Sequence, residues 1–187
     1  MRVEACQRSR PEAATARGGR GRGAQLTVAL AAAALTSSAR TVCTRLLLFK
    51  LRRDVRALNA GDIQPLLSGF AEDAVLRFND GEHRWAGEHR GTDAIAAFLR
   101  SFVDSGLRGQ VTELFVAGPL WRLTLIARFD DQAHDATGTE IYRNRTVLLA
   151  RARWGRIVSQ EDFYEDTQRI VSLEQRLRER EARRPQA

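Results

Sequence analysis

The sequence is poor in the residues that build metal centres and disulfide frameworks. It has two cysteines, Cys6 and Cys43, which lie too far apart in the chain to form a C-x-x-C motif. Its three histidines, His83, His89 and His134, lack the spacing of zinc ligands. We therefore expect no metal ion, no other cofactor and no disulfide framework.

Lysine is nearly absent, because Lys50 is the only one and every other basic residue is an arginine. The net charge of +7 is also unevenly spread. Residues 1–40 hold seven arginines against two glutamates, whereas the rest of the chain holds 23 basic and 21 acidic residues. The basic character therefore belongs mostly to the N-terminal segment, and we expect no specific nucleic-acid partner.

Long apolar runs are missing too, since none reaches the roughly 18 residues of a membrane-spanning helix. The N-terminal segment leaves alternatives open. Leu26–Leu35 follows an arginine-rich stretch and precedes small residues, an order that resembles a secretory signal. Alternatively, the segment is a disordered Arg/Gly/Ala-rich tail, or it results from an upstream start codon chosen in error. We expect residues 1–40 to be disordered and the protein to be cytoplasmic and bacterial, or secreted if Leu26–Ala39 acts as a signal peptide.

A long β-hairpin is the clearest feature that is present. Residues 140–149 alternate between two sets of side chains, and a period of two sends these sets to opposite faces of a strand. Gly155 supplies the turn, and Arg156–Tyr164 forms the return strand. Asp162, a carboxylate inside an apolar strand, is the most unusual residue of the hairpin.

The other predicted elements give an α+β order. They are helices over 41–59, 63–67, 93–104 and 166–181, and strands over 75–78, around Trp85, 110–116 and 120–129. Helices come first, one helix lies between strands, and a run of long antiparallel strands follows.

Four local signatures in this order resemble the NTF2-like superfamily, and within it the SnoaL-like proteins. They are FAEDA (Phe70–Ala74), HRGTDAIAAFL (His89–Leu99), YRN (Tyr142–Asn144) and GRIVSQEDFYEDT (Gly155–Thr167). The resemblance covers about Leu46–Val171. It implies a domain over 41–168 and a charged C-terminal helix and tail over 169–187. The implied fold is a cone: a strongly curved, mostly antiparallel sheet wraps around the N-terminal and middle helices, encloses a pocket and often dimerises through the sheet.

The catalytic pattern is similar to that of limonene-epoxide-hydrolase-like members of the superfamily. In that pattern Arg128 and Asp130 on one strand, with Asp162 on the last strand, hold a water between two carboxylates. One carboxylate acts as base and the other as acid, because nearby carboxylates push their pKa values apart. Arg128 and Asp130 equally suit an exposed ion pair at a strand end.

Asp162 alone suits the acid/base group of SnoaL-like cyclases, since burial raises the pKa of a carboxyl group. It equally suits a structural role, in which it hydrogen-bonds Tyr142 or Asn144 across the hairpin. Aromatic and polar residues expected to line the substrate pocket, or to be core residues beside it, are Tyr142, Asn144, Trp85, Trp121, Phe98, Asn79 and Tyr164.

The resemblance does not fix a function, because the same cone serves several enzymes and non-catalytic modules. We expect a protein that binds a small apolar ligand, forms a homodimer through the sheet and has no membrane span. It is either an acid/base enzyme of isomerase, cyclase or epoxide-hydrolase type, or a non-catalytic module that binds a ligand or another protein.

Overall fold

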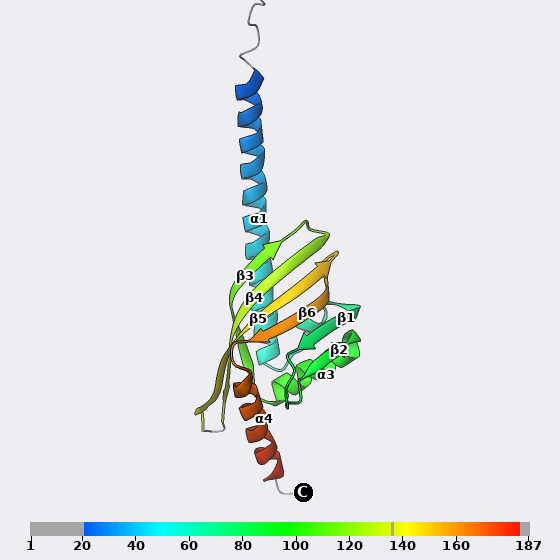
Figure 1. The fold of residues 1–187 in the computed structure, drawn as a ribbon, viewed down its shortest axis with the longest axis vertical. Helices are drawn as coiled ribbons and strands as arrows, with labels where there is room; N and C mark the ends of the chain where they lie inside the picture. The colour runs from blue at the N-terminus through cyan, green and yellow to red at the C-terminus, as the bar shows by residue number, and fades with distance from the viewer. Residues whose placement is uncertain (1–20, 136, 184–187) are drawn as a thin grey trace, which may run out of the picture. The chain divides into compact units, whose positions relative to one another are not determined.

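The computed structural model describes residues 21–135 and 137–183, with side chains from residue 39 onward. The chain divides into two compact units, Met1–Thr41 and Val42–Ala187. Helix α1 (Gly21–Asn59, Figure 1) begins in the first unit, twenty residues before the start that the sequence predicted at Thr41. The alanine-rich stretch after Gly21 favours this extension, because alanine has the highest helix propensity.

Only the second half of the segment that was predicted to be disordered, residues 1–40, lies in the described part of the chain. Residues 1–20 lie outside the described part of the chain, while residues 21–40 are helical. Whether this segment contributes to the stability of the domain that follows stays a prediction.

A curved six-stranded sheet forms the centre of the second unit, in the order β2-β1-β6-β5-β4-β3. Neighbouring strands are antiparallel except β1 and β6, which are parallel. The strands are β1 (Phe70–Phe78), β2 (Gly87–Arg90), β3 (Arg108–Ala117), β4 (Arg122–His134), β5 (Glu140–Arg153) and β6 (Arg156–Tyr164). The α+β fold with a mostly antiparallel, strongly curved sheet is therefore confirmed.

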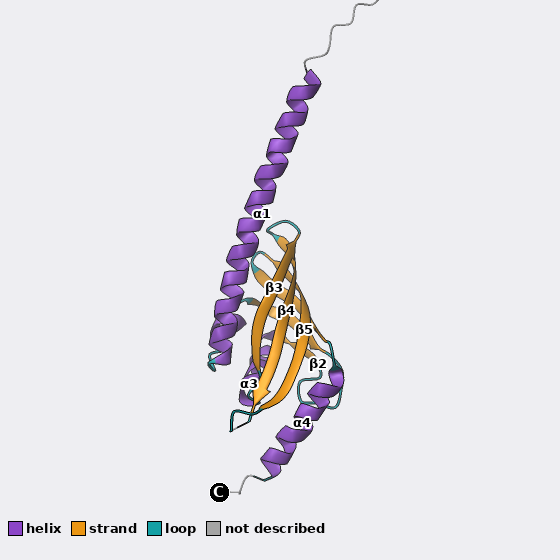
Figure 2. Cartoon of the chain, turned by 90° about the vertical axis from the view of Figure 1, so that its left-hand side faces the viewer, coloured by secondary structure: helices purple, strands orange, loops and turns teal. Residues whose placement is uncertain are grey.

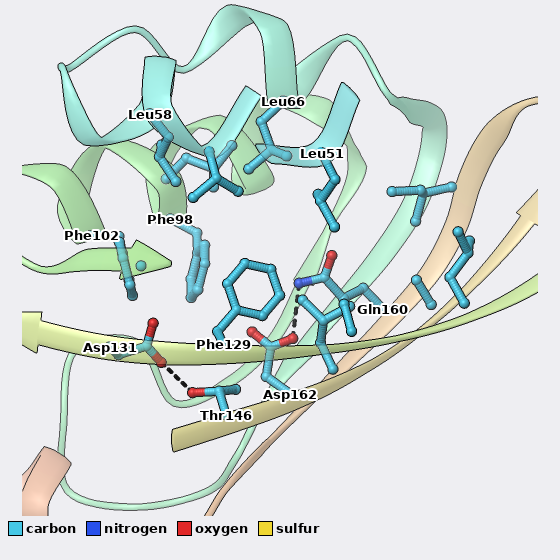
Figure 3. A pocket seen from close by; sticks show the side chains of 18 of the residues that line it. Leu51, Leu58, Leu66, Phe98, Phe102, Phe129, Asp131, Thr146, Gln160 and Asp162 are labelled. Carbon is cyan, nitrogen blue, oxygen red and sulfur yellow. Dashed lines mark hydrogen bonds between the residues drawn. The ribbon is translucent and has the colours of Figure 1, made fainter. Parts of the chain in front are cut away.

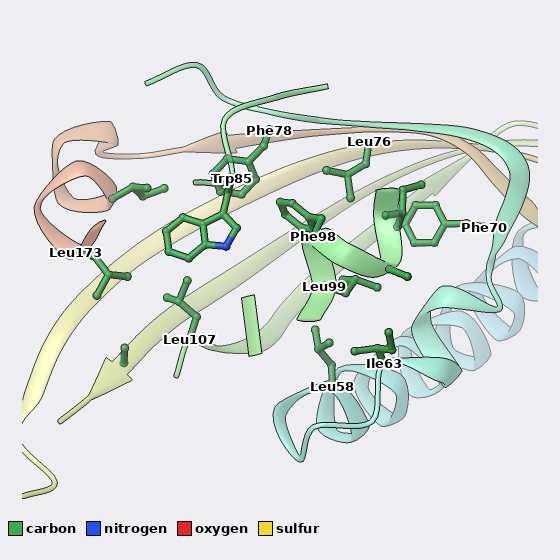
Figure 4. Packing of buried hydrophobic residues seen from close by; sticks show 14 of the residues in the cluster. Leu58, Ile63, Phe70, Leu76, Phe78, Trp85, Phe98, Leu99, Leu107 and Leu173 are labelled. Carbon is green, nitrogen blue, oxygen red and sulfur yellow. The ribbon is translucent and has the colours of Figure 1, made fainter. Parts of the chain in front are cut away.

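Three further helices accompany the sheet: α2 (Gln64–Leu67), α3 (Gly91–Asp104) and α4 (Thr167–Ala182). Figure 2 shows α3 behind the sheet and α4 leaving its lower end. Ile95, Phe98 and Leu99 make the buried stripe of α3. They join the main core, which also holds the largest fully buried side chain, Trp85 (Figure 4).

A second, smaller core lies between the C-terminal part of α1 and strands β3 and β4. Val55 packs there with Val111 and Phe129. Leu47 and Leu51, which are only partly buried, lie against the same cluster. The spacing of the leucines along α1 puts them on one helical face, so the sheet covers that face.

Strand β4 is longer than the sequence predicted. It runs to His134, five residues beyond the expected end at Phe129. Asp130 and Asp131 are therefore strand residues, and the pleat sends their side chains to opposite faces of the sheet. Asp130 is exposed and Asp131 is buried.

The junction between β6 and α4 is fixed by polar contacts. The Asp166 carboxylate accepts hydrogen bonds from the backbone amides of Gln168 and Arg169, and so caps α4. Asn144 donates from Nδ2 to the Asp166 carbonyl oxygen at 2.7 Å. The end of β6 and the beginning of α4 are thus held against β5.

We expect deletion of residues 1–40 to leave the thermal midpoint within about two degrees of that of the full chain. The segment has almost no large apolar side chains outside Leu26–Leu35, so it has little apolar surface to bury against a domain. Differential scanning calorimetry of the two chains measures the difference. A clear loss of stability in the shorter chain would make the segment part of the fold.

Candidate functional site

A cavity of about 130 Å³ lies between strands β3–β6 and helices α1–α3 (Figure 3). An apolar cavity of about 150 Å³ can hold benzene, so this one has room for a group of about one ring. Most of its wall is aliphatic or aromatic. The polar side chains in the wall come from three adjacent strands: Asp131 from β4, Thr146 from β5, and Gln160, Asp162 and Tyr164 from β6.

Asp162 points into the cavity from β6, where it pairs with Leu148 of β5. The side chain of Gln160 donates a hydrogen bond from Nε2 to Asp162 Oδ1 at 2.8 Å. Removal from water raises the pKa of Asp162 from 3.8 to about 7, and the charge of Asp131 adds to this; the bond from Gln160 acts in the opposite direction. At neutral pH both forms of the Asp162 carboxyl group are populated, which is what a group that takes up and releases protons needs.

Asp131 is the second carboxyl group in the cavity. It is 4% exposed, and Thr146 Oγ1 donates a hydrogen bond to its Oδ2. Burial raises its pKa from 3.8 to about 6; the bond from Thr146 lowers the pKa and the charge of Asp130 raises it. Asp131 is not among the predicted site residues, because the sequence predicted that this strand ends before it. The alternation that puts Ala127 and Phe129 on the inner face also puts Asp131 there once the strand continues.

The two carboxyl groups are near each other without being adjacent. Asp162 is in register with Leu148, and Leu148 with Ala127, which lies four residues before Asp131 on β4. Inward-facing residues follow one another at about 7 Å along a strand. Both carboxyl groups therefore line the same cavity, but two such steps along the sheet separate them.

Tyr164 lies on the same inner face and in register with Thr146. Burial raises the pKa of its phenol well above 10.0, and the nearby charges of Asp131 and Asp162 act in the same direction. The phenol therefore stays protonated at neutral pH and is a hydrogen-bond donor.

Arg128 and Asp130 are not brought together with Asp162. Both lie on the outer face of the sheet, opposite the cavity, and Arg128 contacts Glu113 of β3 at 3.5 Å. The resemblance had pointed to Arg128 and Asp130, but the inner face of β4 presents Asp131. Asp130 and Asp162 therefore lie on opposite faces of the sheet.

Tyr142 and Asn144 are buried on the inner face of β5, but neither lines the cavity. The Asn144 amide is engaged with the backbone of Asp166 and Arg145. Neither residue hydrogen-bonds Asp162, whose donor among the described residues is Gln160. The two residues support the fold next to the cavity.

The remaining expected pocket residues divide into three groups. Phe98 of α3 lines the cavity. Trp85 is 1% exposed and packs in the main core, and the Asn79 amide is buried beyond the end of β1 without a hydrogen-bond partner among the described residues. Trp121 is 57% exposed in the turn before β4, outside the cavity.

Within residues 21–135 and 137–183, no cluster of three or more His, Cys, Asp or Glu side chains is arranged to hold a metal ion. No helix of the described chain is long and apolar enough to cross a membrane. The chemistry that the cavity itself supports is proton transfer: it holds two carboxyl groups with raised pKa values and one protonated phenol in an apolar wall.

Solved structures share this fold at low sequence identity. An NTF2-like protein of unknown function from Burkholderia pseudomallei is 22% identical, with a TM-score of 0.55 over 67% of this chain and 94% of that chain. TerC, crystallised with polyporic acid, is 21% identical, with a TM-score of 0.53 over 65% and 92%. A putative polyketide cyclase from Xanthomonas campestris is 23% identical, with a TM-score of 0.50 over 70% and 98%.

No curated protein matches the sequence. The SnoaL-like domain family, in contrast, matches residues 51–160. This match covers more than half of the chain and includes the cavity walls from Leu51 of α1 to Gln160 of β6. The protein therefore belongs to the SnoaL-like domain family and has the NTF2-like fold.

Proposed function

We propose that the protein binds a small, mainly apolar molecule in the cavity and acts on it by acid/base catalysis, as an isomerase or a cyclase. The observation that carries this proposal is the pair of carboxyl groups, Asp131 and Asp162, in an otherwise apolar wall. Such a wall keeps their pKa values near the pH at which they would work.

In the proposed reaction Asp162 is the base that removes a proton from a carbon next to a carbonyl group. Tyr164, which stays protonated, donates a hydrogen bond to the oxygen on which negative charge then develops. Protonated Asp162 returns the proton at another carbon atom, which gives an isomer. In a cyclase, the carbanion instead attacks a second carbonyl carbon of the same molecule, and protonated Asp162 gives its proton to the alkoxide oxygen that forms as that C=O π bond breaks. Asp131 helps to keep the pKa of Asp162 high through its negative charge.

The size of the cavity supports a substrate whose reacting part is about one ring. The names of two proteins of the same fold, a putative polyketide cyclase and TerC with bound polyporic acid, support an oxygenated cyclic or cyclisable compound. An epoxide-hydrolase reaction has less support, because it would use Arg128 and Asp130 beside Asp162, and both face outward.

The second candidate is a non-catalytic ligand-binding module, and the modest volume of the cavity favours it. In such a module we expect large aromatic side chains to fill the cone and Asp162 to be fully paired. Trp85, Trp121 and Tyr142 do not line the cavity, and Asp162 has a single described donor. We therefore rank the enzyme first.

Replacement of Asp162 by asparagine tests the proposed reaction. We expect Asp162→Asn to lower kcat/KM by about a hundredfold or more, because a general base of this kind contributes that much. The amide oxygen still accepts the bond from Gln160, so folding should be retained. Wild type and variant are screened together on steroid-like enones, polyketide-like diketones and epoxides.

Asp130→Asn is the matched control for this screen, since it makes the same chemical change on the opposite face of the sheet. It should leave turnover unchanged. Turnover that survives in Asp162→Asn would remove the catalytic role. If Asp162→Asn lowers the thermal midpoint and wild type turns over none of the compounds, the binding module is favoured.

The raised pKa values also predict how stability depends on pH. A carboxyl group whose pKa is raised in the folded state does not destabilise the fold while it is protonated in both states. The free energy of unfolding then falls as the pH rises from the unfolded-state pKa to the folded-state pKa. For Asp162 the difference between 3.8 and about 7 corresponds to at most about 4 kcal/mol. Between about pH 4 and pH 7 wild type should therefore lose more stability than Asp162→Asn.

Carbon-13 NMR titration of the aspartate carboxyl groups checks this prediction without a substrate. Asp131→Asn should lower the pKa of Asp162, because it removes a negative charge that raises it. Asp130→Asn serves again as the control. An Asp162 that titrates near pH 4 in wild type would contradict the proposed role.

We also propose that two copies associate through the outer face of the sheet. Four apolar side chains are exposed there: Phe115, Ile126, Val147 and Phe163, between 41% and 61% exposed. Phe115 is in register with Ile126, and Val147 with Phe163, so they form two neighbouring rows across β3–β6. Such a patch is typical of an interface between subunits.

Analytical ultracentrifugation of Phe163→Glu tests this association. A buried unpaired carboxylate would disfavour the interface, so we expect a wild-type dimer and a monomeric variant. Leu46→Glu is the control, because Leu46 is comparably exposed, at 64%, but lies on α1. A wild type that stays monomeric at all concentrations would contradict the proposal.

A further inference from the structure

The β3–β4 and β5–β6 turns lie at one end of the sheet (Figure 1), and both expose large apolar side chains. The β3–β4 turn carries Leu120 and Trp121, 70% and 57% exposed, and the β5–β6 turn carries Trp154, 82% exposed. The amide of Trp154 donates a hydrogen bond to the carbonyl oxygen of Trp121 at 3.2 Å, so the turns lie side by side. Clustered exposed side chains of this size mark a surface that binds something.

A row of three arginines crosses the strand ends directly behind these turns. Arg122 of β4 is in register with Arg153 of β5, and Arg153 with Arg156 of β6. Like charges directly opposite each other destabilise a sheet. No carboxylate pairs with any of the three among the described residues; the guanidinium of Arg156 donates to the carbonyl oxygen of Ser68 at 2.6 Å. The row is therefore a concentration of uncompensated positive charge.

The sequence around both turns contains no acidic residue. Residues 114–129 and 141–160 include four arginines besides the three of the row, and neither aspartate nor glutamate. The two stretches thus carry basic but no acidic side chains. This charge favours an anionic partner.

Trp154 has an unfavourable backbone conformation for its side chain. It takes a φ of +50°, and Gly155 follows with a φ of +79°, as in the two-residue turn that prefers Asn-Gly. A bulky residue rarely adopts this left-handed conformation. The indole ring makes few contacts in the folded chain that could offset this unfavourable conformation, because most of its surface faces solvent.

We propose that Leu120, Trp121 and Trp154, with the arginine row Arg122–Arg153–Arg156, form a docking surface for an anionic membrane. We call these six residues the tip surface. Indole rings favour the level of the lipid headgroups, and guanidinium groups pair with lipid phosphates. An aliphatic side chain at a protruding turn suits shallow insertion. Single-stranded nucleic acid, in contrast, needs a groove that follows its backbone. The tip surface is independent of the function proposed for the cavity.

Vesicle binding by the full chain tests this proposal. The probes are vesicles of equal parts phosphatidylcholine and phosphatidylglycerol, and vesicles of phosphatidylcholine alone. With the anionic vesicles we expect a blue shift of the tryptophan emission and quenching by brominated lipid. The tryptophans all lie outside residues 1–40, so vesicle binding by that arginine-rich segment alone gives no quenching. Trp85 is buried and supplies an unquenched background.

Two variants of the tip surface should separate charge from insertion. Arg122→Gln with Arg153→Gln should weaken binding to anionic vesicles about 25-fold, or about fivefold for each arginine. Arg100→Gln with Arg180→Gln removes the same charge from exposed positions on α3 and α4, and should weaken binding to anionic vesicles less than twofold.

Trp154→Asn should reduce the quenching by brominated lipid, because the indole ring is lost. It should also raise the thermal midpoint, because asparagine is favoured in this turn.

Several results would overturn the proposal. One is binding to anionic vesicles without a shift or quenching of the tryptophans, which would assign the binding to another segment. An equal blue shift and equal quenching with phosphatidylcholine alone would remove the role of the arginine row, and so would equal weakening of binding by the control pair on α3 and α4.

Two further outcomes would assign the surface to another partner. Tryptophan quenching by a single-stranded oligonucleotide but by neither vesicle would assign the surface to nucleic acid. Loss of self-association in Trp154→Asn, without vesicle binding in wild type, would assign it to a second copy.

Discussion

The two-residue alternation of the long strands is the constraint on which the rest of the structure depends. In β4, β5 and β6 it separates a wall of mostly apolar side chains from an outer face rich in arginine. The same alternation selects Asp131 over Asp130 for the interior. Because burial raises the pKa values of the inward-facing carboxyl groups, their protonation depends on the cavity.

The cavity leaves each carboxyl group partly unpaired. Asp131 receives a bond from Thr146, and Asp162 one from Gln160, which leaves lone pairs of both groups available to a bound molecule. A buried carboxylate outside the cavity, in contrast, is paired with arginines. Glu174 of α4 is 2% exposed and accepts bonds from Arg84 and Arg178, which lower its pKa against the effect of burial. The contrast separates carboxylates that stabilise the fold from those that face the cavity.

Much of this fold was predictable from the sequence, because periodicity and turn residues act locally. The order of elements and the long hairpin follow from them. The end of β4 did not, because the polar stretch Asp130–His134 is typical of a loop, and only pairing with β5 makes it a strand. Aromatic residues were equally ambiguous: Trp85 is core and Trp121 exposed, a difference that depends on tertiary packing rather than on spacing.

The parallel pairing of β1 with β6 has a consequence for how the chain folds. Strands β3 to β6 are joined by consecutive hairpins and can form through local contacts, whereas Phe70 of β1 meets Ile157 of β6 across nearly half of the chain. Contacts between such distant segments form slowly, since a long loop must close first. During synthesis β1 and β2 therefore cannot join the rest of the sheet until β6 has been made. Strand β6 also carries Asp162 and Tyr164. The nine residues that complete the sheet are the ones that complete the cavity, so a chain with an unfinished sheet also has an unfinished site.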